Sequence, residues 1–185
     1  MKDLLQQYKP FLLFLGKFFL SYLLLTIIYQ AYFNQFDAKT FEVDGLTKSV
    51  ATQTVWVLSL VDNQSFTMPN LSEQSEKLFY KNKYIARIIE GCNGVSVMIL
   101  FVAFIIAFSG KLKNTLLFIL LGLVIIHVLN IFRIALLSIA LYFYPQSEVL
   151  LHEILFPLII YGTVFILWII WVNNYSSYAK VSKEK

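Results

Sequence analysis

Three side chains that could take part in catalysis interrupt otherwise apolar parts of this sequence: Cys92, Arg133 and His152. Cys92 is the only cysteine, and it lies in a small polar pentapeptide, residues 90–94, directly before an apolar run. A thiol near a helix N-terminus and an arginine ionises more readily to the nucleophilic thiolate. A histidine exchanges protons near neutral pH, and a fixed cation stabilises negative charge. Together these groups predict acyl transfer through a thioester.

Two glycines flank the thiol. Gly91 and Gly94 leave room for a substrate backbone to approach closely. Free backbone N–H groups at the start of the following helix could bind an oxyanion. The alternative for Cys92 is a buried, unreactive side chain, which is the usual state of a lone cysteine. The residues alone favour neither interpretation.

Arg133 lies within an apolar stretch. Placing its charge in a membrane costs at least ~2.5 kcal/mol, so the side chain needs a partner or a wet cavity. Asn130 precedes it by three residues and therefore lies on the same side of a helix. One interpretation is a helix-packing arginine paired with Glu90 or Glu153, and the other is a fixed cation in a polar pocket.

The composition indicates a polytopic membrane protein. Hydrophobic residues make up 58% of the chain and charged residues 14%, against roughly half and about a quarter in soluble domains. One cysteine excludes an intrachain disulfide and a multi-cysteine metal site. The sequence has no cofactor-binding motif and no clustered metal ligands, so we expect no cofactor and no metal. The net charge of +4 is scattered, which argues against a nucleic-acid partner.

Four apolar runs reach or approach the ~20 residues that cross a hydrocarbon core. The expected spans cover residues 11–33, 93–109, 115–142 and 150–172. We expect Pro157 to kink the last span, and Tyr29 and Trp171 to join aromatic belts at the two interfaces. The predicted fold is an all-α integral membrane protein, a bundle of four transmembrane helices forming a single membrane domain over residues 1–185. We expect no removable signal peptide.

Lysine and arginine are distributed unequally among the short polar segments. The N-terminal segment has two, the turn at 110–114 has two, the C-terminal tail has three, and the turn at 143–149 has none. The positive-inside rule then places both termini in the cytoplasm. Residues 34–91 become one extracytoplasmic segment of about 55 residues, too small for a robust independent domain. We expect it to lean on the lipid bilayer or on the helices.

This topology brings Cys92, Arg133 and His152, on three different spans, to a similar depth near the outer face. His127 competes with His152 for the role of proton carrier. We favour His152 because it lies at the outer boundary, as Cys92 does, whereas His127 lies deeper in the third span.

The 34–91 segment contains weaker signals. Apolar residues at helical spacing follow Thr47, a candidate N-cap, although β-branched residues around Val55 keep a strand interpretation open. Lys81 and Asn82 separate two runs rich in apolar residues, which predicts a hairpin turn because Asn accepts positive φ.

Three motifs in the second half of the chain resemble the exosortase/archaeosortase family. They are Glu90-Gly91-Cys92-Asn93-Gly94-Val95, then Asn130-Ile131-Phe132-Arg133-Ile134, then His152-Glu153 with Phe156-Pro157 and Tyr161-Gly162. The order of cysteine, arginine and histidine on successive membrane helices is similar to that family's core. The compact size of the chain and the residues of these motifs look most like the flavobacterial exosortase F branch. The resemblance covers residues 88–172, and the chain has fewer spans than many members.

The resemblance implies a membrane-embedded cysteine protease or transpeptidase. Its substrates would be membrane-anchored, surface-destined proteins with a C-terminal sorting tail, made of a short motif, a transmembrane helix and a basic cluster. The resemblance implies that Cys92 is the nucleophile, His152 the general acid and base, and Arg133 the stabiliser of thiolate or oxyanion. Supporting positions would be Glu90, Asn93, Asn130 and Glu153. The site would face the periplasm from a bacterial inner membrane, and the reduced bundle could need a membrane partner or a second copy.

Two other functions stay open at this point. The chain could be a non-enzymatic helical subunit or assembly factor of an inner-membrane complex, in which Arg133 and Glu153 join helices. It could also be a thiol acyltransferase that acts on lipids.

Overall fold

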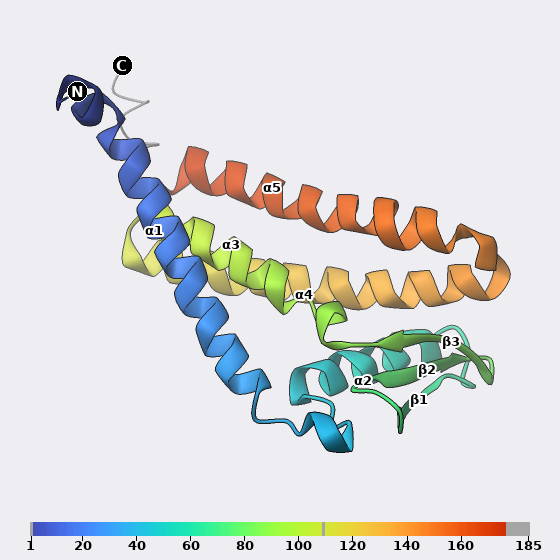
Figure 1. Cartoon of the computed structure of the whole chain (residues 1–185). Coiled ribbons are helices and arrows are strands. Elements are labelled where there is room, and N and C mark those ends of the chain that lie inside the picture. The colour runs from blue at the N-terminus through green and yellow to red at the C-terminus, as the bar shows by residue number, and fades with distance from the viewer. Residues whose placement is uncertain (1, 109, 177–185) are drawn as a thin grey trace.

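The computed structural model describes residues 2–108 and 110–176, so most of the basic tail, residues 177–185, lies outside the described residues. The main elements are α1 (Lys2–Phe33), α2 (Gly45–Ser59), β1 (Phe66–Pro69), β2 (Glu76–Tyr80), β3 (Lys83–Ile88), α3 (Val95–Ala107), α4 (Leu112–Phe143) and α5 (Phe156–Asn174). Helices α4 and α5 lie side by side, and α3 covers the first half of α4 (Figure 1). Helix α1 crosses α3, while α2 and the sheet gather against the second half of α4.

Within the described residues, three stretches are long and apolar enough to cross a membrane. They cover Tyr8–Phe33, Leu112–Phe143 and Pro145–Asn174. Helix α3 has 13 residues, which is about 20 Å and shorter than the ~20 residues of a full crossing. The second expected span, residues 93–109, therefore does not reach full length as a helix, and helix length alone does not support the count of four spans.

The chain after α3 is held by α5. The indole N–H of Trp171 donates to the carbonyl of Phe108 at 3.0 Å, and Gly110 forms a bridge with Ser176. Non-helical backbone at membrane depth needs such partners because lipid offers none. Trp171 is completely buried, so its expected place in an exposed aromatic belt is wrong.

Helices α3 and α4 approach closely at one glycine. A Cβ atom built at Gly122 would collide with the ring of Phe101. Phe101, Ile126 and Val164 are buried in one cluster that joins α3, α4 and α5. This contact holds the N-terminal end of α3 at the level of Asn130.

The segment between α1 and α3 is not wholly helical, which corrects the all-α prediction. The helix interpretation of the region after Thr47 is confirmed as α2, but its N-cap is Asp44, whose carboxylate accepts from the N–H groups of Leu46 and Thr47 at 3.0 Å. The expected hairpin is confirmed as β2–β3, with Lys81 and Asn82 at φ of 51° and 58°. Strand β1, which was not predicted, completes the antiparallel order β1-β2-β3.

The sheet and α2 share a core with α4. Leu58, Leu78 and Ile88 are buried together with Ile134 and Ala135 of α4. Because Ile88 ends β3 inside this core, the chain that follows it enters the next turn from a fixed position.

The start of the last span departs from an α-helix. Residues Leu150–Leu155 form a π-helix, and Pro157 lies in the first turn of α5 directly after it. Proline has no N–H to donate to the preceding turn, which suits a widened turn at this place and agrees with the expected irregularity. Segments of π-helix are frequent at functional sites, and this one carries His152.

Candidate active site

Cys92 ends a short 3₁₀ turn, Glu90–Cys92, which joins β3 to α3. Its N–H donates to the carbonyl of Ile89 at 2.9 Å. Its carbonyl accepts from the side-chain amide of Asn130 at 2.8 Å. The half-buried thiol is thus carried by a backbone that is tied both to its own turn and to α4.

Gly94 completes this turn in a left-handed conformation, with φ of 80°. A Cβ atom at this position would lie 3.2 Å from Cγ of Asn130. The position therefore requires glycine both for its backbone and for the close approach of α4.

The side chain of Asn93 points toward α1 and α2 and lines neither of the two cavities described below. Its amide donates to the hydroxyl of Tyr29 at 2.9 Å and to Thr47 at 3.3 Å, and its Oδ1 accepts from the N–H of Val95 at 3.0 Å. Asn93 thus anchors the cysteine turn to α1 and α2. Tyr29 is buried, so it does not belong to the expected aromatic belt.

Arg133 lies one turn after Asn130 on α4. Its Nη1 donates to Oδ1 of Asn130 at a long 3.5 Å, and its buried Nε has no hydrogen-bond partner among the described residues. Within the described residues no ion pair joins it to Glu90 or Glu153. The structure therefore supports the interpretation of a fixed cation in a pocket over that of a packing ion pair.

The two histidines lie in different surroundings. The ring of His127 is hydrogen-bonded to Oε1 of Gln53 on α2 at 2.8 Å. His152 is exposed on the π-helix, next to Glu153. His152 lines both cavities described next, and His127 lines neither.

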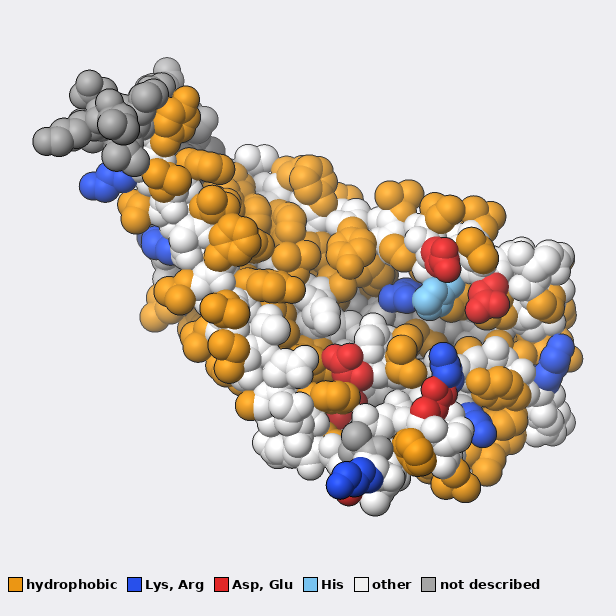
Figure 2. Space-filling view, in the orientation of Figure 1, with side chains coloured by type: hydrophobic (Ala, Val, Ile, Leu, Met, Phe, Trp, Pro, Cys, Tyr) orange, Lys and Arg blue, Asp and Glu red, His pale blue; other side chains and the backbone are white. Residues whose placement is uncertain are grey.

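Two adjoining cavities meet at Arg133 and His152. The first, about 340 Å³, lies between α3, α4 and α5. Its lining includes Gly91, Gly94, Asn130, Arg133, His152, Glu153 and Tyr161. The second, about 380 Å³, lies between β3 and α4 and is also lined by Cys92. Figure 2 shows this face hollowed between α5 and the sheet, with a histidine and charged side chains around the hollow. The structure thus brings Cys92, Arg133 and His152 onto one cavity, whereas Glu90 and Asn93 line neither.

Some of the backbone N–H groups at the start of α3 already donate hydrogen bonds, and others do not. The N–H groups of Cys92, Asn93 and Val95 already have acceptors within the turn. In the described part of the chain, the N–H groups of Ser96 and Val97 have none, and both residues line the first cavity. An oxyanion could therefore be bound by these two groups rather than by the N–H of the cysteine.

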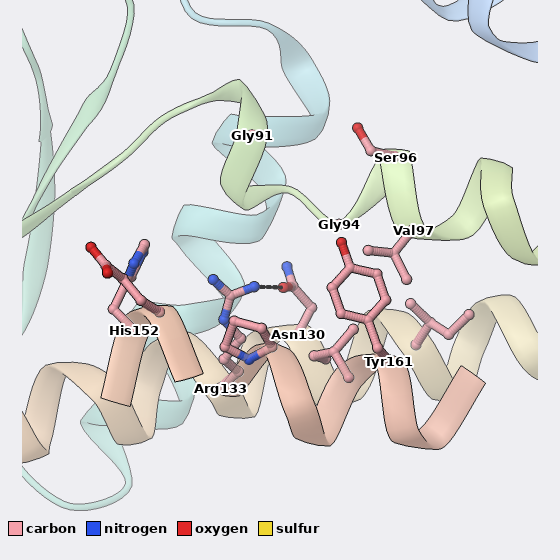
Figure 3. A pocket seen from close by; sticks show the side chains of 12 residues that line it. Gly91, Gly94, Ser96, Val97, Asn130, Arg133, His152 and Tyr161 are labelled. Atoms are coloured by element: carbon pink, nitrogen blue, oxygen red, sulfur yellow. Dashed lines mark hydrogen bonds between the residues drawn. The ribbon is translucent and has the colours of Figure 1, made fainter. Parts of the chain in front are cut away.

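Sequence reasoning assigned no role to Tyr161. Its side chain points from α5 toward the Gly94 end of α3 (Figure 3), and it lines the first cavity together with Arg133 and Asn130. Tyr161 belongs to the Tyr161-Gly162 pair of the family resemblance. Apart from that, its signal in the sequence is a polar group within an apolar span, which many interfacial tyrosines share.

The second cavity has a charged rim. Arg87 lines it and forms an ion pair with Glu73, and the hydrogen bond from Arg87 holds the pKa of that carboxyl below its ordinary value. Glu148 lines the same cavity. Among residues 2–108 and 110–176, no group of three or more His, Cys, Asp and Glu side chains is arranged to hold a metal.

Comparison with known proteins gives one match. Residues 10–172, most of the chain and all of the elements that form the two cavities, match the family model described as transmembrane exosortase. No curated protein and no solved structure matches the chain. Because the match extends from the first span to the last, the chain belongs to the transmembrane exosortase family.

Proposed function

We propose that this chain is a membrane-embedded cysteine protease or transpeptidase, of the exosortase F branch, that cuts C-terminal sorting tails from surface-destined proteins. The observation that carries the proposal is the shared cavity: the lone cysteine, Arg133 and His152 come from three separate segments and line one space. Membership of the family is consistent with a cysteine nucleophile.

The proposed reaction has two halves. His152 takes the proton of the Cys92 thiol, and Sγ attacks the carbonyl carbon of the scissile peptide bond. Arg133 and the free N–H groups at the start of α3 stabilise the oxyanion that forms. The carbon–nitrogen bond then breaks, and His152 gives its proton to the leaving amine. The products are a thioester on Cys92 and a released tail with a new N-terminus.

In the second half, water or an amine attacks the thioester carbonyl. His152 takes the proton of this nucleophile, the carbon–sulfur bond breaks, and the thiol is regenerated with that proton. Water gives a free carboxylate, whereas an amine on a surface acceptor gives a new amide.

The supporting positions act through the cysteine turn. Asn130 holds the carbonyl of Cys92 and faces Arg133. Asn93 fastens the turn to α1 and α2. Glu153 lines the first cavity beside His152, while Glu90 lies in the turn itself. None of these side chains needs to touch the reacting atoms to position the groups that do.

The site lies in the half of α4 that is nearer to the end opposite the Lys111 turn. With both termini in the cytoplasm, this end faces the periplasm from the inner membrane, and residues 34–91 lie outside the cytoplasm. The substrate is then a protein anchored in the same bilayer, and a membrane partner or a second copy of the chain completes the docking of its tail.

The decisive experiment replaces Cys92 in the native host cell. Terminal-peptide mass spectrometry of membrane and surface proteins measures the fraction of each protein that has lost an apolar C-terminal tail. We expect Cys92→Ala to leave these precursors uncut at normal chain abundance. We expect Ser72→Ala, at an exposed position that lines neither cavity, to process them normally.

Full tail removal by Cys92→Ala would refute the proposal. If, in addition, Arg133→Ala lowered the abundance of the chain, the non-enzymatic function of a membrane-complex subunit would be favoured, because an arginine that only joins helices acts through stability.

A further inference from the structure

Strand β3 is an edge of the sheet. The strand order is β1-β2-β3, so β3 pairs with β2 on one side. On its other side, no backbone hydrogen bond joins β3 to any segment within residues 2–108 and 110–176. Alternate residues of a strand direct N–H and C=O groups toward that open side, which makes it a template for an added strand.

The second cavity runs along this open edge. Its lining includes six consecutive residues, 84–89. Successive side chains of a strand point to opposite faces of the sheet, so the side chains that line a cavity over one face come from every second residue. Lining by consecutive residues therefore indicates a trough along the edge itself.

The opposite wall of the trough is α4, which contributes Leu137, Ser138 and Leu141. The volume of about 380 Å³ lies within the ~300–1,000 Å³ usual for binding sites. At one end the trough reaches Cys92, Arg133 and His152. A chain lying in it would therefore lead directly to the thiol.

The other edge of the same sheet offers a contrast. In the described part of the chain, strand β1 is also unpaired on one side. Met68 on this strand is 51% exposed, close to the 48% of Tyr84 on β3. None of the cavities described above is lined by residues of β1. The open edge of β3, but not that of β1, is therefore connected to the candidate active site.

We propose that the exported segment of the substrate, on the N-terminal side of the cut, binds in extended form along β3 as a fourth strand. This inference rests on the proposed function. The first cavity lies among α3, α4 and α5 and takes the membrane-anchored side of the substrate. The exported side then approaches along β3 and runs toward Cys92, as β3 itself does, so the added strand is parallel to β3.

Site-specific photo-crosslinking in the native host tests this placement. p-Benzoylphenylalanine replaces Tyr84, Met68 or Tyr161, one at a time, in a Cys92→Ala chain that retains uncut substrate. We expect position 84 to crosslink to precursor residues on the N-terminal side of the tail, position 161 to crosslink to the tail side, and position 68 to give no precursor adduct.

Crosslinking at positions 84, 68 and 161 distinguishes the proposed placement along β3 from the proposed function. Adducts at 161 without adducts at 84 would overturn the β3 placement and leave the proposed function intact. Equal adducts at 84 and 68 would also overturn it, since the two edges would then not differ. No precursor adduct at either 84 or 161 would overturn both proposals.

A second test narrows the trough. Leu141→Trp adds bulk to its α4 wall, and Leu136→Trp places the same side chain on an exposed face of α4 that lines neither cavity. We expect Leu141→Trp to lower tail removal about tenfold or more, while N-ethylmaleimide alkylates Cys92 at the wild-type rate. Leu136→Trp should change neither quantity. Wild-type tail removal by Leu141→Trp would contradict the proposal.

Discussion

Gly94→Ala tests how tightly the cysteine turn is fixed. An alanine at φ of 80° costs about 1–2 kcal/mol in the left-handed region. Its Cβ would lie 3.2 Å from Cγ and 3.3 Å from Nδ2 of Asn130. That amide can yield only by weakening its hydrogen bond to Cys92, worth about 0.5–1.5 kcal/mol. The sum is about 1.5–3.5 kcal/mol, or roughly 10- to 300-fold in an equilibrium constant.

The assay has two readouts. Thermal unfolding is measured on the purified chain in detergent, and the fraction of precursor that is cut is measured in cells. We expect Gly94→Ala to lower both. The matched control is Gly162→Ala in α5, where an added Cβ meets no atom within 4 Å and the helix should gain about 0.5–1 kcal/mol. If Gly94→Ala matched Gly162→Ala in stability and processing, the turn would not be held by the contact with Asn130, and the reasoning would fail.

Three further predictions concern the site and the sheet. Asn130→Ala leaves the carbonyl of Cys92 without its donor, and tail removal should fall about tenfold at unchanged chain abundance. His152→Ala should slow tail removal by about 10²–10⁴-fold, whereas His127→Gln should mainly lower the thermal unfolding temperature, since that ring bonds α2 away from both cavities. Burial raises the pKa of Glu76 above its ordinary value of 4.5. Protonated Glu76 therefore contributes stability that is fully present below pH 4.5 and is lost as pH rises through the raised pKa. Glu76→Gln should therefore abolish this loss in thermal unfolding measured from about pH 4 to 8.

Local chemistry accounts for the elements that were predicted correctly in the 34–91 segment. The β2–β3 turn depends on Lys81 and Asn82 adopting positive φ, and Asn is among the few residues that do so readily. The start of α2 shows the limit of such reasoning. Asp44 and Thr47 are both suitable N-caps by type, and Thr47 is instead buried beside Asn93. That choice depends on a partner 46 residues away in the chain.

Long-range packing accounts for the elements that were not predicted. Strand β1 is only four residues long, and it is stable because β2 supplies its hydrogen bonds. Helix α3 ends two residues before the end of the expected span 93–109, where the indole of Trp171 of α5 donates to the carbonyl of Phe108. No local periodicity in an apolar run reports where another helix will offer such a partner.

The sequence by itself determined which residues could do chemistry, because Cys92 is the only thiol and because an arginine and a histidine are costly in apolar surroundings. It also determined the long apolar helices, since their length and hydropathy are local properties. Only the tertiary structure decided that Asn130 holds the cysteine backbone, that Asn93 faces α1, and that Arg133 and His152 lie between two cavities. These arrangements depend on the close approach of α3 to α4 at glycine and on the anchoring of β3 beside α4. Such contacts join residues far apart in the chain, so no spacing along the sequence reports them.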